Sequence, residues 1–279
     1  MPGRREIKDR IRGIRSIEQI TRALKAVSMA KAARAQAAVQ AARPYDRMLR
    51  EVVGLIAGAA HQARHPLLET RAVNRACLVV VSADRGLSGA FDVPILRRAL
   101  EESGAFPAAV YVAVGRKAAS FLNFRGLELA GTFVDLDENV HIRDARSIAR
   151  HVITGYERGD FDRADLVYSE FVNFFEHRTT VAPLIPVPIK EETARNYIFE
   201  PEAEAVLEAV LPLFIKEAVF HALTESKASE HSARLAAMDG ATRNAGEMID
   251  RLTLQLHRAR QAAVTGELLE IIPATAALE

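Results

Sequence analysis

Hydrophobic residues in the first part of the chain recur at steps of three and four, which is the spacing of one face of an α-helix. The pattern covers about residues 4–60, and after Met29 its apolar members are mostly alanine, the best helix former. The series begins with Ile7, Ile11, Ile14, Ile17, Ile20, Leu24 and Val27. Pro44 lacks an amide donor, so we expect it to kink or interrupt this helix.

The last part of the chain carries the most regular pattern. Two mostly apolar series repeat every seven residues and interleave at spacings of three and four, as the a and d positions of a coiled coil do. The series are Leu235, Thr242, Ile249, Leu256 and Ala263, and Met238, Ala245, Leu252 and Ala259. A helix over about 212–270 would be on the order of 90 Å long at about 1.5 Å per residue.

Between these helical parts, short apolar runs alternate with amphipathic stretches. The runs at 77–82, 108–114, 166–172 and 181–189 are typical of strands, and helices are expected at 94–103, 116–124 and 144–158. Three prolines in the last strand predict an edge position, because proline cannot donate a hydrogen bond to a neighbouring strand. Alternation of strands and helices predicts a small α/β domain.

The predicted fold class is therefore α/β. A long antiparallel coiled coil of the N- and C-terminal helices would carry an inserted, small Rossmann-like α/β domain. The predicted domains are an N-terminal coiled-coil helix at 1–60, the α/β domain at 72–190, and a C-terminal coiled-coil helix at 202–279.

Composition agrees with long helices, since aromatic residues make up only 6% and there is no tryptophan. The single cysteine, Cys77, excludes an internal disulfide and lies in an apolar run, so we expect it to be buried and inert. No run approaches the roughly 18 apolar residues of a membrane span. No apolar segment near the start resembles a secretion signal.

Charge is unevenly distributed along the chain. The net charge is +1, yet residues 1–50 hold thirteen Lys/Arg and four acidic residues, which is 13 − 4 = +9. Such a helix favours an acidic partner surface, which from charge alone is nucleic acid, anionic lipid or an acidic protein loop. A solvated face without a partner is the plain alternative.

Three stretches of the sequence resemble the γ subunits of F-type ATP synthases. The first comprises IKDRI at 7–11, QITRALKAV at 19–27 and ARPY at 42–45; the second is SADRGLSG at 82–89. The third and most specific runs from SEHSARLAAMDGAT at 229–242 to RARQAAVT at 258–265. The match extends along the whole chain.

The resemblance implies a non-catalytic central-stalk rotor without a cofactor or metal of its own. Its partners would be the ring of α and β subunits, the ε subunit and the membrane c-ring, with proton flow coupled to ATP synthesis or hydrolysis by rotation. The implied location is peripheral, on the cytoplasmic face of a bacterial inner membrane. An acidic β-subunit loop then becomes the partner of the +9 segment.

Site residues are carried over from the family only where the motifs match. The implied subunit contacts are Arg260, Gln261 and Thr265 with a β-subunit loop, Leu24 and Lys25 with the acidic β-subunit loop, and Tyr197, Phe199 and Glu200 near the c-ring. The sequence departs from the family pattern at Ser88, Ala90, Asp92, Gly266 and Pro273. Gly266 would weaken the end of the helix, and Pro273 would interrupt the tail.

Other functions are weighed against this interpretation. A nucleotide-binding enzyme is suggested by the glycines at 86 and 89 between a strand and a helix, but neither G-x-G-x-x-G nor a Walker A motif is present. A nucleic-acid binder would need a recognised fold or interleaved aromatics. A free-standing coiled-coil scaffold is also open. His61 and His65 have the spacing of two metal ligands, but no third ligand is evident.

Overall fold

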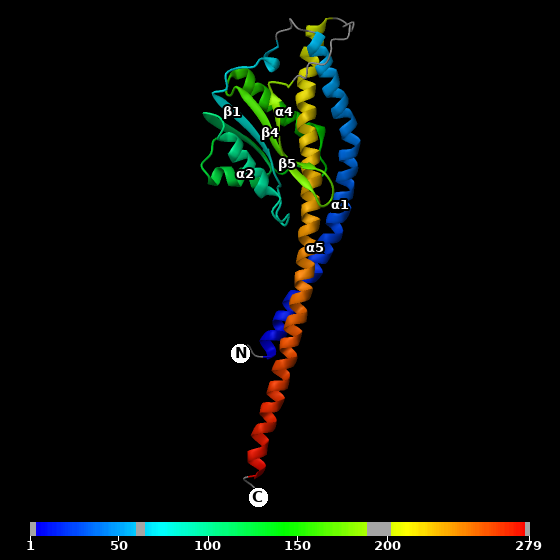
Figure 1. Ribbon diagram of the computed structural model, residues 1–279, viewed down its shortest axis with the longest axis vertical. Coiled ribbons are helices and arrows are strands. Elements are labelled where there is room, and N and C mark those ends of the chain that lie inside the picture. Colours follow the sequence, from blue (N-terminus) through cyan, green and yellow to red (C-terminus); the bar gives the residue numbers. More distant parts are fainter. Residues whose placement is uncertain (1–3, 60–64, 189–201, 277–279) are drawn as a thin grey trace. The chain divides into compact units, whose positions relative to one another are not determined.

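The computed structural model describes residues 4–59, 65–188 and 202–276 (Figure 1). The elements in chain order are α1 (Arg4–Ala59), η1 (Pro66–Leu68), β1 (Arg75–Val81), α2 (Asp92–Ser103), β2 (Ala108–Val114), α3 (Arg116–Phe124), β3 (Leu129–Phe133), α4 (Ile142–Arg158), β4 (Arg163–Phe171), β5 (His177–Ile185) and α5 (Ala203–Ala276). The chain divides into two compact units. Residues 1–28 and 235–279 form the terminal unit, and residues 29–234 form the sheet unit.

One five-stranded sheet organises the sheet unit, with the order β3-β2-β1-β4-β5. The first four strands in this order are parallel, and β5 pairs antiparallel with β4 at the edge. This arrangement confirms the predicted Rossmann-like α/β fold and the edge position of the proline-containing strand. β1 and β4 are neighbours, so the point at which the strand order reverses lies between them.

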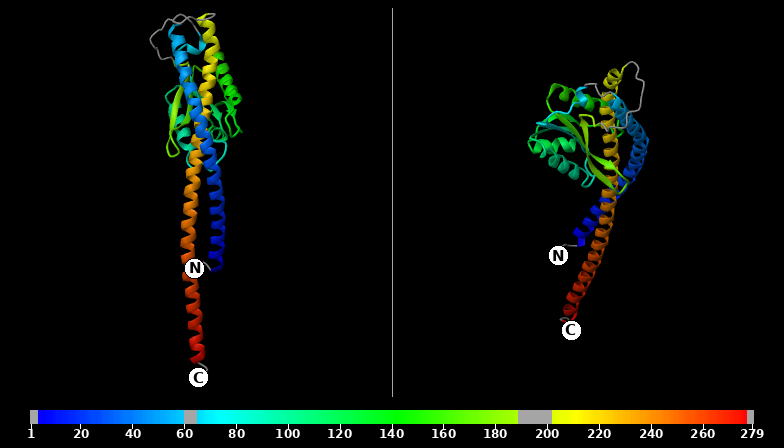
Figure 2. Two further views of the ribbon diagram at one scale, coloured as in Figure 1. Left: turned by 90° about the vertical axis from the view of Figure 1, so that its right-hand side faces the viewer. Right: turned by 45° about the horizontal axis from the view of Figure 1, so that its top comes forward.

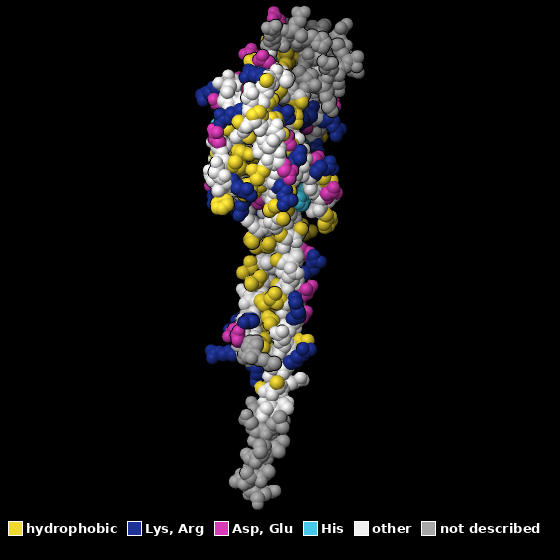
Figure 3. Space-filling model, turned by 60° about the vertical axis from the view of Figure 1, so that its left-hand side comes forward, with side chains coloured by type: hydrophobic (Ala, Val, Ile, Leu, Met, Phe, Trp, Pro, Cys, Tyr) yellow, Lys and Arg dark blue, Asp and Glu magenta, His cyan; other side chains and the backbone are white. Residues whose placement is uncertain are grey.

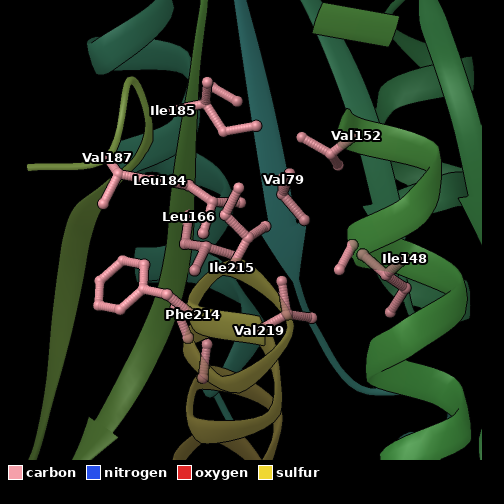
Figure 4. Close-up of a cluster of buried hydrophobic side chains, with 14 of the residues drawn as sticks. Val79, Ile148, Val152, Leu166, Leu184, Ile185, Val187, Phe214, Ile215 and Val219 are labelled. Carbon is pink, nitrogen blue, oxygen red and sulfur yellow. The ribbon is translucent and has the colours of Figure 1, made fainter. Parts of the chain in front are cut away.

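Side chains of the central strands point alternately to the two faces of the sheet and pack into two separate cores. Cys77, Val79 and Val81 of β1 face α4 and α5, whereas Leu78 and Val80 face α2 and α3. Figure 4 shows the first of these cores, in which Phe214, Ile215 and Val219 of α5 pack against strand residues such as Val79 and Leu166. The sheet is thus covered on both faces, as its continuous apolar strands require.

Helix α1 runs unbroken through Pro44, so the expected interruption is wrong. Pro44 is exposed, and the carbonyl group left without its helical donor can be hydrated by solvent. Buried or half-buried residues of α1 recur at spacings of four and three over its whole length, for instance at Ile7, Ile11 and Ile14 and later at Leu49 and Val53. This is the 3.5-residue repeat of a coiled-coil helix.

Helix α5 extends from Ala203 to Ala276, beyond both ends of the stretch at 212–270 and within the predicted C-terminal segment at 202–279. Pro212 lies inside the helix rather than at its start, and burial of Leu207 and Leu211 in the core supplies packing that offsets the missing hydrogen bond. The helix also continues through Pro273, so the expected interruption of the tail is wrong. The two predicted seven-residue series occupy its least exposed face between 235 and 263, with Met238 and Ala245 buried.

The two long helices pair antiparallel in each unit. In the terminal unit Thr21 contacts Thr242 and Lys25 contacts Asp239, so residue numbers fall along one helix as they rise along the other. In the sheet unit Arg43 contacts Glu225, and Arg50 lies over the ring of Phe214. The views in Figure 2 show α1 and α5 side by side in both units.

Two elements were missed in the sequence. β3 alternates half-buried and exposed residues at the other edge of the sheet and contains Gly131, so it lacks the continuous apolar run that marked its neighbours. The 3₁₀ helix η1 spans only three residues and is capped by His65, whose Nδ1 accepts from the backbone N of Leu67 at 3.1 Å.

Candidate subunit-contact surfaces

The last turns of α5 in the terminal unit lie beyond its pairing with α1. The contacts of Thr21 with Thr242 and Lys25 with Asp239 place the first residue of α1, Arg4, opposite about residue 259 of α5. The predicted contact residues Arg260, Gln261 and Thr265 follow this point and are exposed. Their side chains are available to a partner, although the Thr265 hydroxyl already donates to the Gln261 carbonyl at 2.9 Å.

The apolar series at the start of α1 departs from the contact face of the helix. From Ile7 to Val27 it advances 20 residues in six steps, about 3.3 per step, whereas the buried face advances 3.5 per step. The series therefore leaves the contact face after Ile14. Ile17, Ile20 and Val27 are 55%, 56% and 51% exposed. Figure 3 shows hydrophobic side chains on the exposed surface of this helix pair, between Lys and Arg side chains.

Leu24 and Lys25, both predicted to face a partner, have different surroundings. Leu24 is half-buried and belongs to the apolar series that leaves the contact face. Lys25 Nζ donates to Asp239 Oδ1 at 2.5 Å, with side chains 43% and 37% exposed. This hydrogen bond, together with the lysine charge, lowers the pKa of Asp239. The structure thus pairs Lys25 within its own chain.

Ion pairs within the chain neutralise part of the basic segment. Seven of its thirteen cationic residues have a carboxylate partner, namely Arg10, Arg12, Arg22, Lys25, Lys31, Arg43 and Arg50. In the described residues no such pair involves the other six, which are Arg4, Arg5, Lys8, Arg15, Arg34 and Arg47. Four of these six lie in the first fifteen residues, so the surplus positive charge is concentrated at the start of α1.

The structure describes only one of the remaining residues that the sequence singled out, namely His65 of the two histidines considered as metal ligands. Tyr197, Phe199 and Glu200 lie outside the described residues, as does His61. His65 uses Nδ1 to cap η1. Across 4–59, 65–188 and 202–276 there is no group of three or more side chains that could hold a metal ion. No helix in these ranges has a segment long and apolar enough to span a membrane.

The SADRGLSG turn after β1 forms internal contacts. The Asp84 carboxylate accepts from the backbone N of Arg116, Asp135 and Leu136 at 2.9, 3.0 and 3.2 Å. Arg116 is the first residue of α3, so the Asp84 carboxylate accepts at the N-terminus of the helix that follows β2, where a negative charge is favourable. This carboxylate joins the carboxyl ends of three strands.

Helix α5 fills the crevice in which a ligand of a Rossmann-like sheet would bind. Ser226, Lys227 and Glu230 of α5 approach the ends of β1 and β2 and leave a cavity of about 30 Å³. Small-molecule sites usually measure about 300–1,000 Å³. The Ser229 hydroxyl donates to the Ser169 carbonyl at 3.2 Å across the same region. The geometry therefore disfavours the nucleotide-binding alternative.

Sequence reasoning missed several polar residues that hold the elements in place, including Glu225, Glu138 and the role of Asp84. For Asp84 the available signal was a charged residue directly after a buried strand, whereas Glu225 lies among several buried polar residues of α5 and is not marked out by the sequence pattern. Glu138 lies in the loop between β3 and α4, where nothing in the sequence pattern distinguishes it.

Sequence comparisons cover the whole chain. The family model described as ATP synthase matches residues 3–278. The ATP synthase gamma chain of Desulforudis audaxviator is 47% identical over 295 residues, covering 100% of both chains. That of Pelotomaculum thermopropionicum is 46% identical over 284 residues, again covering 100% of both chains.

Solved structures agree on the fold. A chain from the Euglena gracilis mitochondrial ATP synthase has a TM-score of 0.75 at 20% identity, covering 99% of this chain and 94% of that one. A chain from the central stalk and c-ring of the Tetrahymena thermophila mitochondrial ATP synthase has a TM-score of 0.64 at 24% identity, covering 80% and 99%. Because of the full-length identities to gamma chains, together with the fold and the long paired helices, the chain belongs to the ATP synthase gamma chain family.

Proposed function

We propose that this chain is the central-stalk rotor of an F-type ATP synthase and couples transmembrane proton flow to ATP synthesis or hydrolysis by rotating inside a ring of α and β subunits. Full-length identity to ATP synthase gamma chains carries the proposal. The chain is a non-catalytic subunit, and its contribution is mechanical. Rotation presents each catalytic site with a different set of contacts, and only such differences can shift conformational populations.

The exposed end of α5 is the first proposed contact with the ring. Arg260 and Gln261 are exposed beyond the point at which α1 begins, so a β-subunit loop can reach them without displacing another part of the terminal unit. Arginine suits this role because its planar guanidinium group binds carboxylates through two parallel hydrogen bonds. Thr265 lies one turn further along the same helix.

The exposed apolar surface of α1 is the second proposed contact. Exposed Ile17, Ile20 and Val27 and half-buried Leu24 form a band that the paired helix covers only in part, and such a band favours a protein surface over nucleic acid. Arg4, Arg5, Lys8 and Arg15, which form no ion pair with any residue that the structure describes, would attract an acidic loop of the β subunit. We assign the contact at this level mainly to Leu24, because Lys25 is bound to Asp239.

The remaining partners are the ε subunit and the membrane c-ring. We propose that Tyr197, Phe199 and Glu200 contribute to that contact and that the complex lies on the cytoplasmic face of a bacterial inner membrane, to which this chain is peripheral. The division into an N-terminal coiled-coil helix at 1–60, an α/β domain at 72–190 and a C-terminal coiled-coil helix at 202–279 stays a prediction.

Substitution at the end of α5 tests the rotor function. Arg260→Ala in a complex reconstituted with α and β subunits of the same source should lower steady-state ATP hydrolysis and leave the helicity measured by circular dichroism unchanged. Arg251→Ala is the matched control, since Arg251 is also exposed on α5 but lies within the paired region. Equal activity of both variants and the wild type would remove Arg260 from the mechanism, and a collapse of helicity would make it structural.

Leu24→Lys tests the surface on α1. The substitution places a new positive charge beside the acidic loop, so the moving contact should be held too strongly. ATP-driven proton pumping should fall more than assembly of the complex. Arg22→Lys, which keeps the charge two positions away, is the control. Unchanged proton pumping per ATP in Leu24→Lys would exclude the proposed role.

A further inference from the structure

An ion pair between a buried glutamate and a partly exposed arginine of the sheet unit joins both long helices to the sheet. Glu225 of α5, with only 1% of its side chain exposed, accepts two hydrogen bonds from Arg43 of α1, from Nε at 2.9 Å and from Nη2 at 3.1 Å. The same Nη2 donates to the carbonyl of Phe171 at 2.6 Å, and the Phe171 backbone N donates to Glu225 Oε2 at 2.8 Å. Because Phe171 ends β4, this Glu225 clamp connects α1, α5 and the sheet.

A second carboxylate connects the same helices to another part of the sheet unit. Glu138, in the loop between β3 and α4, binds Lys31 of α1 at 2.8 Å and His231 of α5 at 3.3 Å. Burial alone would raise the pKa of Glu138, but the Lys31 hydrogen bond and the surrounding positive charge lower it, so the carboxylate stays ionised. We call this set of contacts the Glu138 clamp.

Between the two clamps, α1 has little continuous packing. A cavity of about 260 Å³ lies there, lined by residues of both helices and of the Glu138 loop, including Arg34, Ala38 and Phe220. The buried apolar side chains of α1 in this stretch are Ala32 and Val39, and Val39 belongs to a small cluster with Phe171 and Ala228. The polar clamps therefore supply directed attachments where the apolar core does not.

The spacing of the clamps decides what they can resist. Lys31 and Arg43 are twelve residues apart on α1, which is about 18 Å along the helix axis. Two attachments at that separation oppose both tilting of the helix and rotation about its axis, which a single attachment would allow. The bidentate geometry at Glu225 adds directional restraint, and removing one partner would leave a buried charge uncompensated.

We propose that the Glu225 and Glu138 clamps form the torsional joint between the helix pair and the α/β sheet. Arg43, Glu225 and Glu138 are positioning residues in this joint. The inference rests on the proposed rotor function, because a joint of this kind matters only in a chain that carries twist. The torsional stiffness of the rotor would then depend on the carboxylates of Glu225 and Glu138.

Single-molecule rotation of the assembled complex tests the joint. The α and β ring is fixed to a surface, and a bead is attached through Phe124→Cys at the end of α3, where the side chain is 88% exposed. Cys77 is fully buried and does not compete for the label. Angular fluctuation of the bead in the stalled complex measures torsional stiffness, at a temperature at which circular dichroism shows every variant to be folded.

Arg43→Ala and Glu138→Gln should each widen the angular fluctuation, and the double variant should widen it further. Arg47→Ala, which changes an exposed arginine one turn along α1, should match the wild type.

A merely structural role would shift the melting temperature and leave the stiffness of the folded complex unchanged, which would overturn the proposal. Should Arg43→Ala fail to assemble, Glu138→Gln decides, because its partly exposed site tolerates the change. A wild-type chain that neither assembles nor rotates would instead overturn the proposed function, and this inference with it.

Discussion

Helix α5 passes through two very different environments. In the sheet unit, none of its side chains from 210 to 233 is exposed, because the sheet, α4 and α1 surround it. In the terminal unit, from 235 to 266, only Met238 and Ala245 are buried. There the helix has one partner, α1, and one narrow contact face. The sheet unit thus contains its own core, whereas the terminal unit buries few side chains of α5 and would gain order from a surrounding partner.

The residues at the contact faces reflect this difference. In the terminal unit, Thr21 and Thr242 share a hydrogen bond of 2.9 Å, and the buried neighbours of Thr242 on its own helix are Met238 and Ala245. Small side chains let the helices approach closely but bury little apolar area. In the sheet unit the same helices present leucine, isoleucine and phenylalanine to the sheet. The helix pair of the terminal unit should therefore depend on the surrounding complex for its rigidity more than the sheet unit does.

Truncation of a core leucine should give the largest contrast. Leu211 is completely buried in the sheet unit, so Leu211→Ala should lower its free energy of unfolding by about 2–5 kcal/mol. Leu254 is 53% exposed in the terminal unit, so Leu254→Ala should change it by less than about 0.5 kcal/mol. Urea unfolding of the isolated chain measures both, and equal effects would contradict the comparison.

Glycine substitutions should have opposite signs in the two units. Gly115 has φ = 93°, and a Cβ there would lie 2.3 Å from the Ser82 carbonyl oxygen, so Gly115→Ala should destabilise the sheet unit by at least about 1–3 kcal/mol. Gly246 lies inside α5 with open space around it, so Gly246→Ala should stabilise that helix by up to about 1 kcal/mol. Thermal melts of the two variants test the signs.

Acidification should weaken the sheet unit through His231. Burial lowers the pKa of this histidine to about 4, so the unfolded chain binds its proton at a higher pH than the folded chain does. The stabilisation that comes from keeping His231 neutral is fully present above about pH 6.5. As the pH falls toward 4, the free energy of unfolding decreases by up to about 1.4 kcal/mol per pH unit. The charged groups around it are Glu138, Glu230, Lys227 and Arg234. His231→Gln should flatten the slope over this range, and an unchanged slope would exclude the histidine as its source.

The smallest effect is expected at Asp239 in the terminal unit. The Lys25 hydrogen bond lowers the pKa of this carboxylate. The ion pair therefore stabilises the folded chain above the ordinary aspartate pKa of about 3.9, and this stabilisation disappears as the pH falls below that value. Carbon-detected NMR titration of the wild type and Lys25→Met would show the Asp239 pKa returning to its ordinary value in the variant. An identical titration would mean that the pair is absent in solution.

Periodicity predicted the parts of the fold that rest on long repeats. The two seven-residue series of α5 mark its contact face with α1, and the apolar runs identified four of the five strands. The errors have local causes. The helices continue through Pro44 and Pro273, where an interruption was expected, because a helix of this length tolerates the loss of one hydrogen bond. β3 was missed because an edge strand needs no apolar run.

The candidate site was predictable only in part. Motif resemblance located Arg260 and Gln261, which are exposed as a ring contact requires. It also grouped Leu24 with Lys25, because sequence alone cannot show that Asp239, 214 residues away, pairs with the lysine. The clamps at Glu225 and Glu138 depend on contacts between distant segments, which a one-dimensional pattern does not contain.

Rotation of a reconstituted complex tests the central claim most directly. The chain is mixed with α and β subunits from the same source, and complex size, ATP hydrolysis and movement of a bead on Phe124→Cys are measured. The rotor account predicts a stable complex with one copy of this chain, increased hydrolysis and unidirectional rotation driven by ATP. A chain that leaves the α and β subunits unassembled, or a complex that hydrolyses ATP while the bead stays fixed, would contradict it.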